Sequence, residues 1–526
     1  MTVDQTTATP PPAGTPPPAG TPALPATRTG GTSGLLRAGA RGAAWLGMSQ
    51  VLSKLTVALT TIVLARLLAP EEFGLVALSL VLIVYAEAVA DAGVAQALIY
   101  LPRSRAVARA AMLCSLVAGL VLVTIVVAGA PLIASFFGRP DMTPLVRLLA
   151  CSLLTASLGA VPEALLRREL LFHRVSVATV LRTLATGLVS VSLAFAGYGA
   201  WALAWGTVAG SATYAVTGWL LLDNRPDLAL WRTTRQDVRA VLGYGLPVAG
   251  SSLLARLIFD IDYLVVGRIA GAVALGYYTL AFRLPELVIL NVFYVLTAVV
   301  FPLYSRMRDD PDRLREGYLF SVRVFSLYGV CAGAGLAVAA PLVVPVLFGD
   351  QWDAAVVPLV ALSIYTALRA VGGGGATEIY KALGRPSVSV YLSLIRLAVL
   401  VPALLLAARW WGMEGVAWAQ VVTSFAFALL MQGVAARVLR LRWRDIAAAI
   451  APALPTGAAI VVVGLLLARL PLPPAAALAV VVVGGAATGV AVLSLVSPSL
   501  VRQLRDVVAR RRTTPSPEPS GVAEPE

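Results

Sequence analysis

Long apolar runs recur along almost the whole chain and limit what it can fold into. Each has about 20 residues or more with few charges, enough for a helix to cross about 30 Å of hydrocarbon. With 59% hydrophobic and 13% charged residues among 526, the chain has more apolar surface than a soluble core of this length needs. The sequence therefore predicts an all-α polytopic membrane protein. About fourteen spans are expected near residues 43–66, 74–100, 110–137, 143–165, 176–197, 200–222, 241–268, 275–304, 317–347, 354–380, 386–408, 412–436, 446–468 and 474–497.

Basic residues are concentrated in every second connection between these spans. The alternate connections hold little beyond Arg66, Arg139, Arg268, Arg409 and Arg469. Because cytoplasmic loops are enriched in Lys and Arg, the pattern predicts cytoplasmic N- and C-termini and an even number of spans in the cell membrane. The net charge of +14 is then explained by topology and anionic-lipid contact. Nucleic-acid binding is not indicated, since the arginines do not gather on one domain.

The chain repeats part of its own pattern. Ile62–Ser79 aligns without a gap with Leu264–Ala281, and Gly197–Ser211 resembles Gly412–Ser424. The first alignment pairs Val63 with Val265, Arg66 with Arg268, Gly74 with Gly276 and Leu78 with Leu280. These echoes indicate two related halves. Because the repeat covers an even number of spans, both halves share one orientation and are related by an axis along the membrane normal, a geometry suited to alternating access.

The spans and the composition together predict the domain organisation. Pro- and Ala-rich residues near the start and Pro- and Ser-rich residues at the end are expected to be disordered. The first apolar run begins after residue 42 and is long enough to span, so no secretory signal is predicted. The predicted units are a cytoplasmic tail (1–34), a six-helix N-lobe (35–222), a cytoplasmic linker (223–240), a six-helix C-lobe (241–440), an extra helix pair (441–500) and a basic, then disordered, tail (501–526).

Charges inside the spans are the candidate functional residues, since each costs about 2.5–3.5 kcal/mol at mid-helix and so usually faces the bundle interior. We predict a cationic cleft for an anionic substrate such as a lipid diphosphate, built from some or all of Lys54, Arg182, Arg256, Arg283, Arg369 and Arg396. The alternative is local pairing at helical spacing, which applies to Arg256 with Asp260, Arg283 with Glu286, and Lys381 with Glu378.

Acidic residues and glycines in the spans suggest how a transport cycle would run. Glu87, Asp91, Asp260 and Asp262 are candidates either for a coupling-ion site, for a proton or Na⁺, or for charge pairs. Gly372, Gly373, Gly374 and Gly375 interrupt an apolar span and are a candidate hinge. No cofactor is predicted, and a proton or Na⁺ gradient or the membrane potential is the expected energy source, because no Walker A loop is present. One histidine and three dispersed cysteines predict neither a metal site nor a disulfide framework.

A membrane enzyme acting on a lipid-linked sugar is the competing class. Such a polymerase or ligase needs a sizeable outward loop that presents acids and bases. Every predicted outward connection is short, and the longest connections, 223–240 and 305–316, are cytoplasmic. Transport is therefore favoured, and no enzymatic activity is expected.

Several segments resemble a known family over about residues 42–440, in order and across both halves. They are ARLLAPEEFGLVAL, DYLVVGRIAGAVALGYYTLAFRLPE, VVFPLYSRMRDDPDRLREGY, VLFGDQW and ALGRPSVSVYLSLIRLAVLVPALLL. The chain is similar to the polysaccharide and lipopolysaccharide exporters of the MOP flippase superfamily, whose fold is shared with MATE drug exporters and the lipid II flippase. Asp262 and Arg283 match residues of the family pattern, whereas Tyr263 stands where that pattern has Asn.

The resemblance implies a bacterial inner-membrane protein with two lobes around a cationic cavity. Its cargo would be a polyprenyl-diphosphate-linked oligosaccharide, flipped to the outer leaflet before polymerisation, with a polymerase and glycosyltransferases as partners. Two alternatives remain at this point. One is the same fold with another cargo, such as lipid II, a teichoic-type precursor or a drug, and the other is a membrane enzyme or assembly scaffold.

Overall fold

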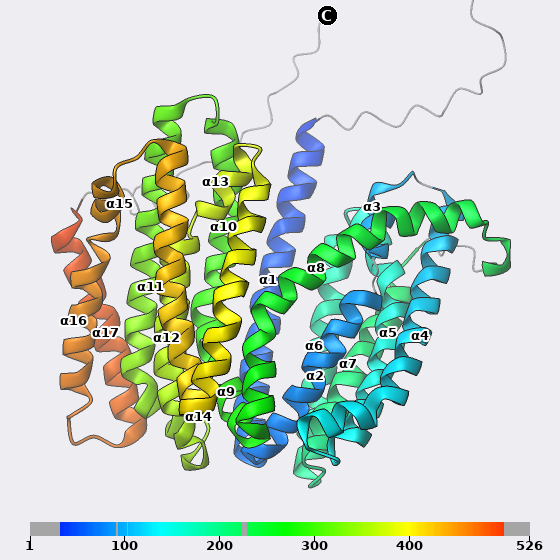
Figure 1. Cartoon of the computed structure of the whole chain (residues 1–526), viewed down its shortest axis with the longest axis horizontal. Coiled ribbons are helices and arrows are strands. Elements are labelled where there is room, and N and C mark those ends of the chain that lie inside the picture. Colours follow the sequence, from blue (N-terminus) through cyan, green and yellow to red (C-terminus); the bar gives the residue numbers. More distant parts are fainter. Residues whose placement is uncertain (1–31, 91–92, 103, 224–228, 499–526) are drawn as a thin grey trace, which may run out of the picture.

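The computed structural model describes residues 32–90, 93–102, 104–223 and 229–498. Within these residues every regular element is a helix, and the helices form two bundles (Figure 1). Both ends of the described chain lie at the same end of the molecule, which we call the terminal end. The opposite end, where α1 ends and α2 begins, we call the sealed end for the packing described below.

The first half contains α1 to α7 and a short 3-10 turn. Its helices are α1 (Thr32–Leu67), α2 (Pro70–Ala90), α3 (Val94–Tyr100), α4 (Arg105–Phe137), α5 (Met142–Arg168), α6 (Phe172–Phe195), α7 (Ala200–Leu220) and η1 (Leu230–Arg232). Within this half α6 packs on α1 and α7, and α5 packs on α4 and α7.

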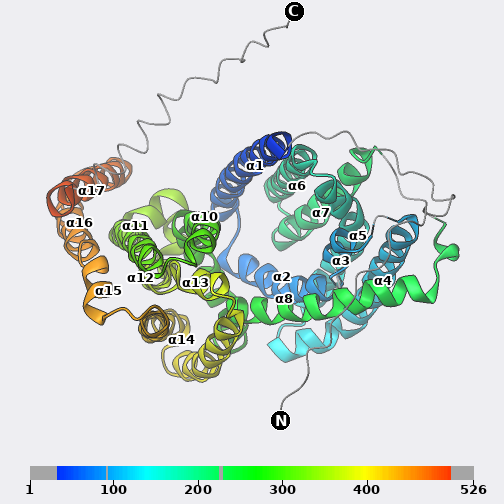
Figure 2. The same cartoon turned by 90° about the horizontal axis from the view of Figure 1, so that it is seen from above.

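The second half begins with α8 and ends with a peripheral helix group. Its helices are α8 (Arg235–Ile269), α9 (Gly271–Pro285), η2 (Glu286–Leu290), α10 (Asn291–Met307), α11 (Pro311–Leu347), η3 (Asp350–Ala355), α12 (Val356–Gly373), α13 (Ala376–Ala382), α14 (Pro386–Leu439), α15 (Trp443–Ile450), α16 (Ala453–Leu467) and α17 (Pro474–Val496). Figure 2 shows α15, α16 and α17 at the outer edge of this half, where α16 and α17 pack on α11.

The number of membrane crossings agrees with the sequence. Among the described residues, 11 helical segments are long and apolar enough to span a membrane. One of them, Ser387–Leu439, turns back at Gly412, whose φ of 58° and ψ of −143° suit only glycine, so it crosses twice. With α7 and α8, which cover a similar height in Figure 1, the described chain makes 14 passes. The predicted all-α fold of about fourteen spans is confirmed.

Two helices begin earlier than the apolar pattern indicates. α1 starts at Thr32, because the Leu, Ala and Arg residues before the apolar run favour helix without being apolar enough to span. α8 starts at Arg235, inside the segment 223–240 that we expected to be a linker. Its start is fixed by a capping box, in which the Thr234 hydroxyl accepts from the Asp237 N–H and the Asp237 carboxylate accepts from the Thr234 N–H.

α8 joins the two halves by packing on both. Figure 1 shows it crossing the front of the molecule from the first half to the second. Near its start, Val241 is buried in a cluster with residues of α3 and α4. The Tyr244 ring stacks on the Tyr100 ring of α3 with centroids 4.5 Å apart. The first helix of the second half is therefore anchored on the first half.

At the sealed end the two halves touch through α2 and α9. A Cβ atom built on Gly74 would overlap the carbonyl oxygen of Ala272, and one built on Gly276 would overlap that of Pro70. The repeat aligns Gly74 with Gly276 and Pro70 with Ala272, so the two contacts are exchanged by the relation between the halves. This reciprocity is what a two-fold axis along the membrane normal produces, and it confirms the predicted parallel repeats.

Contacts of the two arginines that the repeat pairs, and of a buried tryptophan, close the same end. The Arg66 Nε donates to the Leu347 carbonyl at the end of α11, 2.9 Å away, and Arg66 Nη2 donates to the Val346 carbonyl. Its counterpart Arg268 places its guanidinium over the Phe136 ring at the end of α4, 5.1 Å from the centroid. Trp352, fully buried, donates from its indole Nε1 to the Ala65 carbonyl at 2.7 Å. The sealed end is thus tied together from both halves.

Candidate functional site

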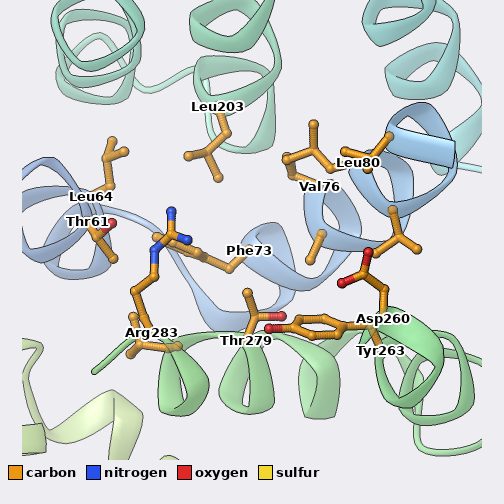
Figure 3. Close-up of a pocket in the computed structure, with 14 residues that line it drawn as sticks. Thr61, Leu64, Phe73, Val76, Leu80, Leu203, Asp260, Tyr263, Thr279 and Arg283 are labelled. Carbon is orange, nitrogen blue, oxygen red and sulfur yellow. The ribbon is translucent and has the colours of Figure 1, made fainter. Parts of the chain in front are cut away.

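A pocket of about 320 Å³ lies between the two halves, above the α2–α9 crossing. Figure 3 shows its side chains, with α1, α2 and α7 on one side and α8 and α9 on the other. The first half contributes mainly apolar side chains, and the second contributes polar and charged ones. The lining residues are Thr61, Leu64, Phe73, Val76, Ala77, Leu80, Val81, Val84 and Leu203 from the first half, and Asp260, Tyr263, Thr279, Leu280 and Arg283 from the second. We call this the interlobe pocket.

Three charged side chains from both halves meet beside the interlobe pocket. Lys54 Nζ of α1 lies 3.6 Å from Glu286 Oε1, and Arg283 Nη1 of α9 lies 3.3 Å from Glu286 Oε2. One carboxylate therefore serves two cations, and the cluster keeps one positive charge in excess. The three side chains are 31–45% exposed, so they face the space between the halves rather than the core.

A break in helix geometry positions this cluster. α9 ends at Pro285, and the next five residues, Glu286–Leu290, form a π-helical turn before α10 continues. Proline removes a backbone donor, and a π turn rotates the following side chains relative to a regular helix. The sequence indicated the Arg283–Glu286 pair by its helical spacing. It did not indicate that Lys54, on a distant helix, shares the same acid.

Asp260 and Asp262 lie on opposite sides of α8. Asp260 faces the interlobe pocket (Figure 3), whereas Asp262 is 2% exposed and points into the second half. The Asp262 carboxylate accepts hydrogen bonds from the Tyr278 hydroxyl at 2.7 Å and from Gln420 Nε2 at 3.0 Å, and also from the Tyr263 N–H. Tyr263 thus supports Asp262 through its backbone and lines the pocket with its ring, at the position where the family pattern has Asn. Among the described residues no cation forms a salt bridge with Asp262.

Arg369 and Arg396 do not line the interlobe pocket. They lie together in a second pocket of about 500 Å³ that is formed within the second half and also contains Lys381 and Glu378. Lys381 Nζ contacts Glu378 Oε1 at 2.9 Å, which is the local pair expected from their spacing. We predicted that these cations share one cleft, but the structure places Arg283 in the interlobe pocket and Arg369 and Arg396 in the second pocket.

The remaining candidates are outside both pockets or outside the described residues. The Arg182 guanidinium of α6 lies over the Tyr214 ring of α7, 5.6 Å from its centroid, within the first half. Glu87 is half-buried on α2. Asp91 lies outside the described residues, and so does the side chain of Arg256, although α8 itself is placed there.

The four consecutive glycines coincide with a break between two helices. α12 ends at Gly373, and α13 begins at Ala376. Gly374 is extended, with ψ of 100°, and Gly375 has a φ of 81°, a conformation that favours glycine. Gly372 packs against Ala428 of α14, whose Cβ would lie 2.5 Å from an added methyl group. The span is interrupted where we predicted, and its role as a hinge stays a prediction.

Residues 63–357 match the family described as "Polysaccharide biosynthesis protein". The chain belongs to this family. Among curated relatives, the lipopolysaccharide biosynthesis protein WzxC of Escherichia coli is 25% identical over 382 residues, covering 71% of this chain and 76% of WzxC. The teichuronic acid biosynthesis protein TuaB of Bacillus subtilis is 25% identical over 338 residues, covering 62% of this chain and 67% of TuaB. The succinoglycan biosynthesis transport protein ExoT of Rhizobium meliloti is 26% identical over 307 residues, covering 58% of this chain and 62% of ExoT.

Solved structures of the same fold are more distant in sequence. The lipid II flippase MurJ, in an inward closed conformation, superposes with a TM-score of 0.70 over 87% of this chain and 99% of its own, at 14% identity. An inward-facing multidrug transporter of the MATE family superposes with a TM-score of 0.61 over 74% of this chain and 94% of its own, at 18% identity. The predicted membership of the polysaccharide exporters and the predicted MOP superfamily fold are both confirmed.

Proposed function

We propose that this protein is a flippase that moves a polyprenyl-diphosphate-linked oligosaccharide from the cytoplasmic to the outer leaflet of the cell membrane, for cell-surface or exopolysaccharide synthesis. Family membership and the transport and biosynthesis roles named for WzxC, TuaB and ExoT support a lipid-linked glycan as cargo. The single observation that carries the mechanism is the reciprocal α2–α9 crossing below a pocket that borders the Lys54–Glu286–Arg283 cluster.

Alternating access follows from the two related halves. In our proposal the terminal end faces the cytoplasm, since the Arg-rich connections and both ends of the described chain are there. The seal at the other end then closes the interlobe pocket from the outside. Rocking of the halves against each other would break the α2–α9 crossing and the bonds of Arg66, and so open the pocket outward.

The Lys54–Glu286–Arg283 cluster would hold the diphosphate. A phosphate that approaches Arg283 competes with Glu286 for the guanidinium, and the excess positive charge favours the doubly charged ligand. Because Lys54 belongs to the first half and Arg283 to the second, a diphosphate bound to both would link occupancy to the relative position of the halves.

A proton or Na⁺ gradient, or the membrane potential, would drive the cycle, with no cofactor. Asp260, which faces the interlobe pocket, and Asp262, buried beside it, are the acids we propose for coupling; Glu87 and Asp91 remain alternatives. Collapse of each gradient by a selective ionophore in transporting cells identifies the driving ion. A polymerase and glycosyltransferases are the partners expected to consume and supply the cargo.

The decisive experiment compares cells with and without this protein. Polyprenyl-linked oligosaccharide is quantified by mass spectrometry, and access to its sugar is probed from outside with a membrane-impermeant glycan-modifying reagent. We expect the lipid to accumulate and stay inaccessible in cells lacking the protein, and Lys54→Ala or Arg283→Ala to reproduce that phenotype with normal levels of folded protein. Normal crossing in the deletion strain would refute the proposal.

A second cargo is favoured by one observation. The superposition on the lipid II flippase covers 87% of this chain, whereas that on the MATE transporter covers 74%. The same mass spectra separate the two candidates, because a lipid II flippase would accumulate a lipid-linked muropeptide and its depletion would cause a peptidoglycan defect.

A further inference from the structure

The pocket within the second half, which we call the C-half pocket, is large and runs toward the terminal end. Its volume is about 500 Å³, and its lining comes from α8, α10, α12, α13 and both arms of α14. Its charged lining residues include Arg369 of α12 and Lys381 near the end of α13. It adjoins the interlobe pocket, since Phe259 of α8 lines the C-half pocket and the next residue, Asp260, lines the interlobe pocket.

Two arginines that line this pocket, from different helices, converge on one buried hydroxyl group. Arg369 Nη1 of α12 lies 3.2 Å from the Tyr365 Oη, and Arg396 Nη2 of α14 lies 3.4 Å from the same oxygen. Arg369 Nη2 also donates to the Tyr294 hydroxyl at 3.1 Å. The two guanidinium groups are therefore held at a separation that one small anion spans.

These two cations have no carboxylate to balance them. In the described part of the chain neither Arg369 nor Arg396 forms a salt bridge, and the one acid in the pocket, Glu378, is occupied by Lys381. Aromatic faces support them instead, with Phe259 4.1 Å from the Arg369 Cζ and Phe427 5.4 Å from the Arg396 Cζ. Neutral hydroxyls and rings compensate these half-buried charges less well than a carboxylate or phosphate would.

Further polar groups face the same space. The Ser389 hydroxyl is buried without a hydrogen-bond partner among the described residues, and Ser393 and Thr377 also line the pocket. Hydroxyls beside aromatic rings suit a sugar, and paired arginines suit a phosphate or carboxylate. An anion in the pocket between Arg369 and Arg396 would be a stronger acceptor for both guanidinium groups than the neutral Tyr365 hydroxyl behind them.

We propose that the C-half pocket binds an anionic group of the cargo, either the diphosphate or an acidic sugar, on the cytoplasmic side before the cargo occupies the interlobe pocket. The inference rests on the proposed function for the identity of the cargo, but the anion site itself rests on Arg369, Arg396 and Tyr365 alone. It assigns to these arginines a role separate from that of Lys54 and Arg283.

The test is a binding titration on the full chain in lipid nanodiscs, with the heat of binding measured by calorimetry. Inorganic pyrophosphate is the probe for a diphosphate, and glucuronate is the probe for an acidic sugar. We expect saturable binding of one or both, weakened roughly 10-fold or more by Arg369→Gln and by Arg396→Gln, because each removes a charge-assisted hydrogen bond. If pyrophosphate binding requires both arginines, the pocket is a diphosphate site. If only glucuronate binding requires them, the pocket is an acidic-sugar site.

Two further variants separate binding from folding and from general charge. Ser393→Leu fills the pocket while keeping every charge and should weaken the same binding. Arg147→Gln removes one positive charge from an exposed position of α5 that lines neither pocket, and should bind as the wild type does. Thermal unfolding and size-exclusion profiles of each variant are compared with the wild type before titration.

The inference is overturned if the wild type binds neither probe at millimolar concentration, or if both arginine variants bind as Arg147→Gln does. If the lipid still requires this protein to cross, the flippase function stands and only the C-half pocket assignment falls. If the lipid crosses without the protein while arginine-dependent binding persists, the anion site stands and the function falls.

Discussion

Substitution of the two crossing glycines should unseal the outer end of the pocket. An alanine methyl group at Gly276 would overlap the Pro70 carbonyl, and one at Gly74 would overlap the Ala272 carbonyl. Both obstacles are backbone atoms, which cannot rotate away as a side chain can. To restore an ordinary C···O contact of about 3.3 Å, α2 and α9 must separate by about 1 Å or more.

The expected size of the effect follows from that overlap. Overpacking of a tight interface costs about 1–3 kcal/mol, and here the cost falls on the sealed conformation alone. The sealed-to-open ratio should then fall by about 5-fold to 150-fold. Alanine also favours a helix over glycine by about 1 kcal/mol, but it does so in both conformations and so does not shift the ratio.

The assay follows access to one cysteine in the interlobe pocket. Thr61→Cys is introduced after the three native cysteines are replaced by alanine, and a membrane-impermeant maleimide is added to intact cells or to inverted vesicles. Gly74→Ala and Gly276→Ala should each raise labelling from outside at least 5-fold and lower labelling from inside. In the double variant, outside labelling should rise by less than the product of the two single-variant increases, because one separation of the helices relieves both overlaps.

The matched control is Gly129→Ala on α4, where an added methyl group meets no atom within 4 Å. It carries the same gain in helix propensity and should label as the parent does. If the crossing variants label like Gly129→Ala while remaining folded, then the α2–α9 contact does not seal the pocket. Labelling that rises from both sides would indicate unfolding instead of outward opening.

Three further predictions concern single residues. Arg66→Gln removes a charged donor from the last carbonyls of α11, so outside labelling of Thr61→Cys should rise several-fold in the same assay. Asp262→Asn places an amide where donors from Tyr278 and Gln420 converge, and should lower the free energy of unfolding by about 1–3 kcal/mol, read from the thermal midpoint; an unchanged midpoint would contradict this packing role. Gly375→Ala forces a side chain to a φ of 81° and should cost about 1–2 kcal/mol, measured in the same way, whereas Gly129→Ala, which only gains helix propensity, should not lower the midpoint.

The sequence predicts those parts of this fold that depend on local pattern. Span length and hydrophobicity predict the passes, and the positions of basic residues predict which connections share an end. The Arg283–Glu286 and Lys381–Glu378 pairs are visible because residues three apart on a helix are neighbours.

Other parts depend on which helices are brought together and have no local signal. The contact of Lys54 with Glu286 joins residues from α1 and η2, and the sharing of Tyr365 by Arg369 and Arg396 joins α12 to α14. The π turn after Pro285 is also hidden, since proline alone does not distinguish a kink from a π turn. For this reason one predicted cationic cleft becomes two separate pockets in the structure.

The relation between the halves explains what the duplication retains and what it changes. The crossing needs identical surfaces, because a two-fold contact packs each copy against the other, and both copies keep glycine there at Gly74 and Gly276. The pocket next to it is not symmetric. Extended without a gap, the same alignment places Val81 opposite Arg283 and Val84 opposite Glu286, so the first half presents apolar side chains where the second presents charges. A seal can be symmetric because it only has to open and close, whereas a lipid with a charged head and an apolar tail is better matched by a pocket with one wall of each kind.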